Sequence, residues 1–169
     1  MRRIAIGSIA IVLLASLQCE PQETKVGPLT RLRQAYIVIE PLSPDAKKLG
    51  LSIRSLESQM LVGLRRDIPR LAIREGVIPN LYLRVTILQE RTVEGRELGF
   101  AAFVNLQVTR PATILEDGAI GEVMVAMLTV WESAVLLTGS RRGIRQQVKE
   151  SVNEKLTAFA ADYYRQNPQ

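Results

Sequence analysis

The sequence of 169 residues contains no histidine and only one cysteine. Histidine is the commonest general acid–base group and a common metal ligand, so its absence excludes the usual hydrolase triads and most zinc sites. A single cysteine excludes an intrachain disulfide and a thiolate metal cluster. The chain also lacks a glycine-rich phosphate loop, a dinucleotide-binding motif and a pair of acids spaced for acid–base catalysis. We therefore predict a non-enzymatic protein without a metal site or a cofactor.

Net charge is modest as well. The formal value is +5, from 22 basic and 17 acidic residues. Arg2 and Arg3 belong to a predicted leader, and without them the net charge falls to +3. Such mild basicity predicts no nucleic-acid partner. The hydrophobic content of 47% and the chain length together indicate one globular domain.

The N-terminus has the pattern of a secretory signal sequence. Arg2 and Arg3 give it a positive start, and Ile4–Leu17 is an uncharged, mainly apolar run of 14 residues. This run fits the apolar region of a signal, which is about 7–15 residues long, and falls short of the roughly 20 residues that span a bilayer. We predict that residues 1–18 are a signal sequence and that the protein is exported.

The only cysteine, Cys19, directly follows this run. The arrangement resembles a bacterial lipoprotein signal, in which such a cysteine becomes the first mature residue and carries the lipid. That family typically has Leu, then Ala or Ser, then Gly or Ala before the cysteine, where this chain has Ser16, Leu17 and Gln18. We predict lipid attachment at Cys19. Ordinary cleavage near Ala15 or Ser16 with secretion, and retention as an uncleaved anchor, are the alternatives.

The mature chain divides into two parts. Residues 19–34 are polar, contain Pro21 and Pro28 and show no periodicity, so we predict a flexible tether. Residues 35–169 form the predicted single domain. It begins with Ala35–Glu40, a β-branched run that predicts a buried strand.

Two amphipathic helices are predicted in this domain. After a predicted loop at Leu42–Leu51, Ser52 can cap the first helix, whose apolar stripe is Ile53, Leu56, Met60, Leu64 and Ile68. Pro69 is expected to end it, and residues 70–80 hold a very short strand or an irregular return. The last helix has the strongest periodicity in the chain, with an apolar stripe of Ile144, Val148, Val152, Leu156, Phe159 and Tyr163.

Three alternating segments between the helices predict longer strands, at Leu81–Arg91, Leu98–Thr109 and Val123–Ala134. Gly95 marks a hairpin turn between the first two. Their alternation gives an antiparallel meander with one apolar and one polar face. We predict an α+β fold in two layers, with two helices packed on one face of a mainly antiparallel sheet of three to five strands. The element order is β-α-(β)-β-β-β-α.

Basic residues cluster where the last helix begins, at Arg141, Arg142 and Arg145. Cations at a helix N-terminus oppose the helix dipole and cost roughly 0.3–1 kcal/mol each at most. A costly placement favours a function, and contact with an anionic lipid head group or an acidic partner surface fits it. The alternative is that all three are solvated loop residues.

The polar face of the sheet carries a second candidate surface, formed by Tyr82, Arg84, Phe103, Asn105 and Gln107. If the neighbouring strands align, these residues make an aromatic and polar patch suited to a protein partner. The alternative is an ordinary solvated face. An exposed strand at the edge of the sheet offers another route to binding, by addition of a partner's strand.

A signal ending in cysteine, followed by strand, helix, strands and helix, resembles the small bacterial envelope lipoproteins. In element order, over roughly residues 19–165, the nearest are the assembly partners of the outer-membrane lipopolysaccharide translocon. The resemblance implies a periplasm-facing domain that binds a larger envelope protein and contacts anionic lipid. We predict an exported, membrane-anchored interaction domain of the cell envelope. The alternative is a small-ligand or anionic-lipid binding module, in the periplasm or secreted.

Overall fold

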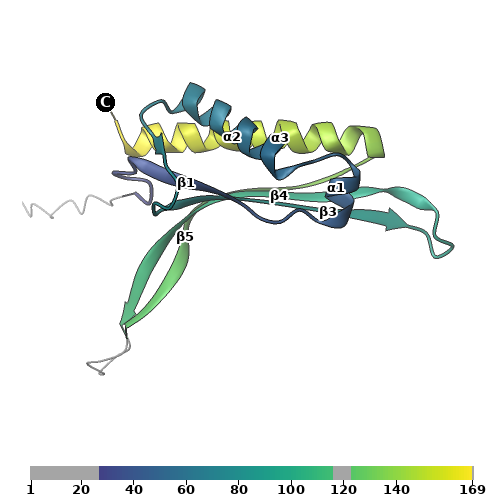
Figure 1. Ribbon diagram of the computed structural model, residues 1–169, viewed down its shortest axis with the longest axis horizontal. Helices are drawn as coiled ribbons and strands as arrows, with labels where there is room; N and C mark the ends of the chain where they lie inside the picture. Colours follow the sequence, from purple (N-terminus) through teal and green to yellow (C-terminus); the bar gives the residue numbers. More distant parts are fainter. Residues whose placement is uncertain (1–26, 116–122, 169) are drawn as a thin grey trace, which may run out of the picture.

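The computed structural model describes residues 27–115 and 123–168, so the predicted signal sequence and Cys19 lie outside the described residues. Five strands form one sheet in the order β2-β1-β3-β4-β5, and two long helices cover one face of it (Figure 1). The predicted two-layer α+β fold is confirmed. In chain order the elements are β1 (Gln34–Ile39), α1 (Pro44–Lys48), α2 (Ile53–Asp67), β2 (Ala72–Ile73), β3 (Asn80–Arg91), β4 (Glu97–Leu115), β5 (Val123–Gly139) and α3 (Arg141–Gln166).

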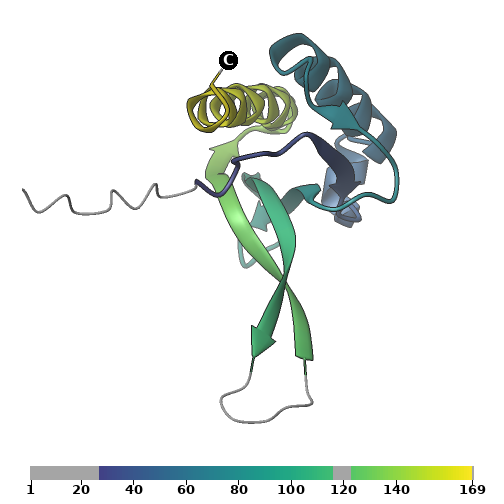
Figure 2. The same ribbon diagram turned by 90° about the vertical axis from the view of Figure 1, so that its left-hand side faces the viewer.

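The sheet is mixed. β1 runs parallel to both β2 and β3, whereas β3, β4 and β5 form an antiparallel meander. Gly95, at φ +82°, lies in the β3–β4 hairpin turn, as the sequence predicts. β4 and β5 continue beyond their predicted ends at Thr109 and Ala134. The second half of β4, residues 109–115, and the first half of β5, residues 123–129, pair with each other. These far halves of the two strands bend away from the sheet as a two-stranded arm (Figures 1 and 2).

The helices lie where the apolar periodicity predicts them. Ser52 accepts a hydrogen bond from the backbone N–H of Ser55 (3.2 Å) at the start of α2, and Ser140 caps α3 in the same way. All six residues of the α3 stripe are buried. In α2 the stripe is buried only from Leu56 onward, and Ile53 is 43% exposed because the first turn does not pack against the sheet.

The core fills the space between the helices and the inner face of β3 and β4. From the helices it takes Leu56, Met60, Leu64, Val152, Leu156 and Phe159, each no more than 1% exposed. From the strands it takes Leu81, Leu83, Val85, Ile87, Phe100, Ala102, Val104, Leu106 and Val108. The alternation that the sequence shows therefore separates a packed inner face of the sheet from an open outer face.

A short helix, α1, replaces part of the predicted loop Leu42–Leu51. Ser43 caps it, and the Ser43 hydroxyl donates to the carbonyl oxygen of Ile87 on β3 (2.9 Å). Asp45 accepts a hydrogen bond from the backbone N–H of Gln89 (3.2 Å), which lowers the pKa of its carboxyl group. These contacts with β3 stabilise a helix of five residues that is too short for periodicity to reveal.

The predicted tether is also corrected. Residues 27–33 pack against the end of α3, with Leu29 and Leu32 buried. The side chain of Gln166 accepts from the backbone N–H of Leu29 (2.7 Å), and Asn167 accepts from that of Arg31 (2.8 Å). The folded domain therefore begins by residue 27, and residues 19–26 of the predicted tether lie outside the described residues.

Candidate functional site

The open face of the sheet brings the predicted partner residues together. The register places Tyr82 opposite Gln107 and Arg84 opposite Asn105 on the adjacent strands β3 and β4. Phe103 lies on the same face, two residues from Asn105, and is opposite Leu136 of β5. The neighbouring strands therefore align so that these residues form one surface, as the prediction of a partner-binding patch requires.

This face is more ordered than a simple solvated surface. Asn105 is only 6% exposed, and its amide donates to the Glu132 carboxylate (2.7 Å). Arg84 forms an ion pair with Glu40, at the end of β1. Two large apolar residues nearby remain exposed, Leu88 at 61% and Leu136 at 68%. The open face thus combines fixed polar pairs with apolar side chains in water.

The outer strand β5 presents an unprotected edge. It is 17 residues long, lies at the end of the described sheet and pairs on one side with β4. Its sequence, VMVAMLTVWESAVLLTG, contains one charged residue, Glu132, and no proline. Natural proteins usually protect such edges with charge, proline or very short strands. The pairing of β5 with β4 is regular except for a register shift between Val108 and Thr109 of β4.

A nearly buried lysine lies beside this edge. Lys155 of α3 is 6% exposed, and its Nζ is 3.4 Å from the hydroxyl of Ser133 on β5. Among the described residues, no carboxylate lies within ion-pair distance of it. Burial lowers the pKa of the ammonium group, and the Glu154 charge partly offsets this shift. An ammonium group that is out of water and without an acid is unfavourable.

Lys155 projects from the side of α3 that faces β5 rather than α2. Two turns earlier on the same side, the side-chain oxygen of Gln147 is buried and has no hydrogen-bond donor among the described residues. About two turns later, Asp162 accepts from the indole N–H of Trp131 on β5 (2.8 Å). The ring of Trp131 also packs edge-on against Phe159, with centroids 5.1 Å apart. These contacts hold α3 firmly over β5.

The three arginines at the start of α3 do not converge on one site. Arg141 pairs with Glu97 (3.1 Å) and lies 5.9 Å above the Phe100 ring. The Arg145 guanidinium packs beside Gly50, and Arg142 is exposed. Contact of these residues with an anionic surface stays a prediction.

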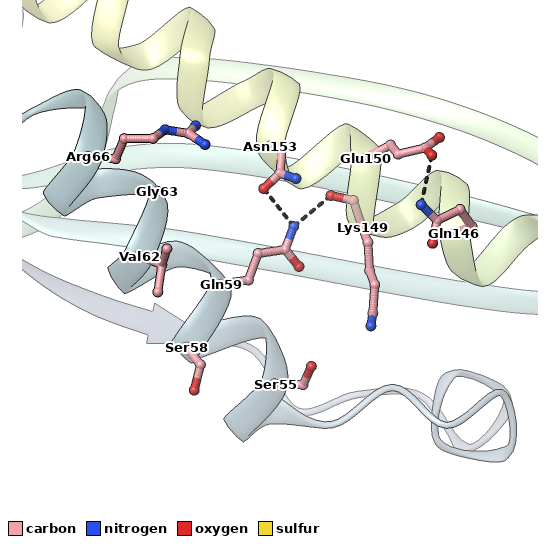
Figure 3. Close-up of a pocket in the computed structure, with 10 residues that line it drawn as sticks. All are labelled: Ser55, Ser58, Gln59, Val62, Gly63, Arg66, Gln146, Lys149, Glu150 and Asn153. Carbon is pink, nitrogen blue, oxygen red and sulfur yellow. Dashed lines mark hydrogen bonds between the residues drawn. The ribbon is translucent and has the colours of Figure 1, made fainter.

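A groove of about 540 Å³ lies between α2 and α3 (Figure 3). Gln59 crosses it and donates to the backbone oxygen of Lys149 (2.6 Å) and to Asn153 (2.8 Å). Ser55, Ser58, Lys149 and Glu150 also line it. Gln146 on the same wall donates to the Glu150 carboxylate (2.8 Å).

Within the described ranges, no three acidic or cysteine side chains gather closely enough to hold a metal ion. None of the helices described is both long enough and apolar enough to cross a membrane.

The sequence matches no known protein family and no curated protein. The chain matches several solved structures at low sequence identity, among them the following two. A PelC dodecamer from Paraburkholderia phytofirmans is 19% identical over 75% of this chain and 84% of that chain, with a TM-score of 0.41. A proposed neuraminyllactose-binding hemagglutinin homologue from Helicobacter pylori is 13% identical over 84% of this chain and 90% of that chain, with a TM-score of 0.35. At these values neither likeness informs the function of this chain.

Proposed function

We propose that the protein is an exported, membrane-anchored, non-enzymatic interaction domain of the cell envelope. In this proposal it binds an extended, acidic segment of a partner protein along the outer edge of β5. The lipid at Cys19 and the envelope location come from the sequence and from its resemblance to envelope lipoproteins. The observation that carries the binding mode is the unprotected edge of β5 beside Lys155.

The geometry specifies the chemistry of the segment. A strand added to β5 hydrogen-bonds to its unpaired backbone groups and presents alternate side chains to α3. The side chain opposite Ser133 comes within about 5 Å of it, on the face that Lys155 covers. A Glu or Asp at that position pairs with the Lys155 ammonium group, 3.4 Å from the Ser133 hydroxyl. The Gln147 side-chain oxygen, which is buried without a donor among the described residues, lies beside Gly139 at the end of β5.

The packing of the core disfavours the alternative of a small ligand held between the helices and the sheet. Leu56, Met60, Val152 and Phe159 occupy that space and are fully buried.

The open sheet face beside β5 extends the proposed binding surface, because Leu136 on β5 and Phe103 on β4 are neighbours there.

A pair of synthetic peptides tests the proposal. Both alternate Val and Thr, and the central residue is Glu in one and Gln in the other. We expect the Glu peptide to bind the chain from residue 20 onward, which contains every described element, at least about tenfold more tightly than the Gln peptide. Lys155→Met should remove this difference, whereas Lys149→Met, on the α2 side of the same helix, should leave it unchanged.

Amide NMR shifts should change along residues 131–138 when the Glu peptide binds. Absence of binding, or equal affinity of the two peptides, would show that β5 does not select an acidic strand. A dimer that the peptide cannot dissociate would show instead that a second copy covers the edge.

A further inference from the structure

The end of the molecule at which the described chain begins carries a cluster of arginines. Arg31 and Arg33 precede β1, Arg70 follows α2, and Arg110 lies in β4 where the arm leaves the sheet. These residues line two hollows that share Arg31, Leu32 and Arg33. Three separate parts of the chain therefore supply four guanidinium groups to one surface, which we call the basic end.

The first hollow, of about 390 Å³, opens beside the C-terminal end of α3 and also contains Arg70, Tyr163 and Asn167. The second, of about 850 Å³, opens on the strand side and contains Arg110 with Ile78, Pro79 and Pro111. Neither hollow is lined by an aspartate or a glutamate. Within the described residues, none of the four arginines forms an ion pair.

One of these groups lacks an acceptor. The Nε atom of Arg110 is buried and has no hydrogen-bond partner among the described residues. Arg33 and Arg70 lie near enough to Tyr163 to oppose the rise that burial causes in the pKa of its hydroxyl. Guanidinium groups bind phosphate oxygens in a bidentate way, so a phosphate group is the anion that suits these donors.

Apolar side chains are exposed beside the arginines. Ile78 is 54% exposed, and the β5 residues opposite Pro111 and Arg110, Met127 and Leu128, are 47% and 46% exposed. Arginines mixed with exposed apolar residues suit the boundary between lipid head groups and acyl chains. A soluble phosphate compound makes no use of the apolar part.

We propose that the basic end rests on the membrane and binds phosphate head groups of anionic lipids through Arg31, Arg33, Arg70 and Arg110. The inference rests on the proposed anchoring at Cys19. Residue 27 is eight Cα–Cα steps beyond Cys19, which limits the distance between them to about 28 Å in a fully extended chain. The lipid would thus hold this end of the domain close to the surface. Arg141 lies at the opposite end of α3, roughly 39 Å away for 26 residues.

Vesicle binding by the unlipidated chain tests this surface. The chain from residue 20 onward is sedimented with phosphatidylcholine vesicles that contain or lack phosphatidylglycerol. We expect binding only to the anionic vesicles, weakening as salt increases. Replacement of the four arginines by glutamine should lower affinity roughly 600-fold, at roughly fivefold for each arginine. Arg141→Gln, Arg142→Gln and Arg145→Gln together remove the arginines that the sequence alone predicts to contact an anionic surface. If the basic end makes that contact instead, this control binds like the wild type.

Circular dichroism confirms that each variant is folded, and the Arg31→Gln, Arg33→Gln double variant substitutes if the fourfold variant unfolds. Undiminished binding by the basic-end variant, or an equal loss in the control, overturns the assignment. So does the absence of binding to anionic vesicles. Displacement by inorganic phosphate at low concentration would identify a soluble phosphate site and also overturn it. The vesicle assay contains no peptide, so it tests the basic end independently of the proposed strand binding at β5. Either proposal can fail while the other holds.

Discussion

Lys155 holds an ammonium group beside a serine hydroxyl rather than an acid, and it is 6% exposed. Its burial lowers its pKa from the ordinary value of 10.5. Between the lowered pKa and 10.5, the unfolded chain binds more protons at this residue than the folded chain does. The free energy of unfolding therefore rises with pH across that window, and the cost of the charge is greatest below it.

We expect Lys155→Met to stabilise the domain at pH 7 by about 1 kcal/mol, because it replaces an unpaired buried charge with an apolar side chain of similar length. The advantage over the wild type should shrink as the pH approaches 10.5. Urea unfolding at several pH values measures both effects, with Lys149→Met, at a half-buried position on the α2 side of the same helix, as the control. A variant less stable than the wild type at pH 7 would mean that the ammonium group is well solvated or paired in solution.

Asn105 shows how far sequence reasoning reaches for single residues. Alternation along β4 correctly predicts that Asn105 faces away from the helices, as Phe103 and Gln107 do. Its burial was not predictable, because it depends on Glu132 of β5, which lies 27 residues further along the chain and bonds to its amide. The basic end was missed for the same reason, since its arginines come from three segments that are far apart in the sequence.

Among the elements, the arm formed by the far halves of β4 and β5 is the least supported by packing. It includes residues 109–115 and 123–129, which bend away from the sheet and from the helices (Figures 1 and 2). The near halves, by contrast, lie under α3, where Trp131 and Phe159 are in contact. A two-stranded ribbon alone is marginally stable in water.

We expect the amides of this arm to exchange with solvent far faster than those of residues 100–108, which are paired with strands on both sides, because the arm can open without disturbing the core. Hydrogen-exchange mass spectrometry resolves the two regions within β4, so the near half of β4 serves as the internal control. Equal protection of both halves would indicate that another chain covers the arm in solution.

The elements themselves were largely predictable from the sequence. The stripes of α2 and α3 and the alternation of β3 and β4 recur over enough residues to identify each element. α1 was missed because its stability comes from contacts of Ser43 and Asp45 with β3, and not from its own pattern. The ordered start at residues 27–33 was missed because Leu29 and Leu32 are isolated apolar residues in a polar segment.

At the scale of the whole molecule, the proposed surfaces are separated along one axis. The basic end lies where the described chain begins and where α3 ends, and the β3–β4 hairpin lies at the other end (Figure 1). The outer edge of β5 runs between them. A domain that stands on its basic end therefore keeps the edge of β5 accessible to a partner in the aqueous compartment.

This arrangement predicts the orientation of the anchored protein. In the lipidated chain on vesicles, a fluorophore at Ile78→Cys should be quenched by a head-group quencher, because Ile78 borders the basic end. A fluorophore at Val93→Cys, fully exposed in the distant hairpin, should not. The intact mass must include acyl chains that Cys19→Ala removes, which verifies the anchor. Equal quenching at both positions would show that the domain lies flat on the membrane, and stronger quenching at Val93→Cys would show that it stands the other way up.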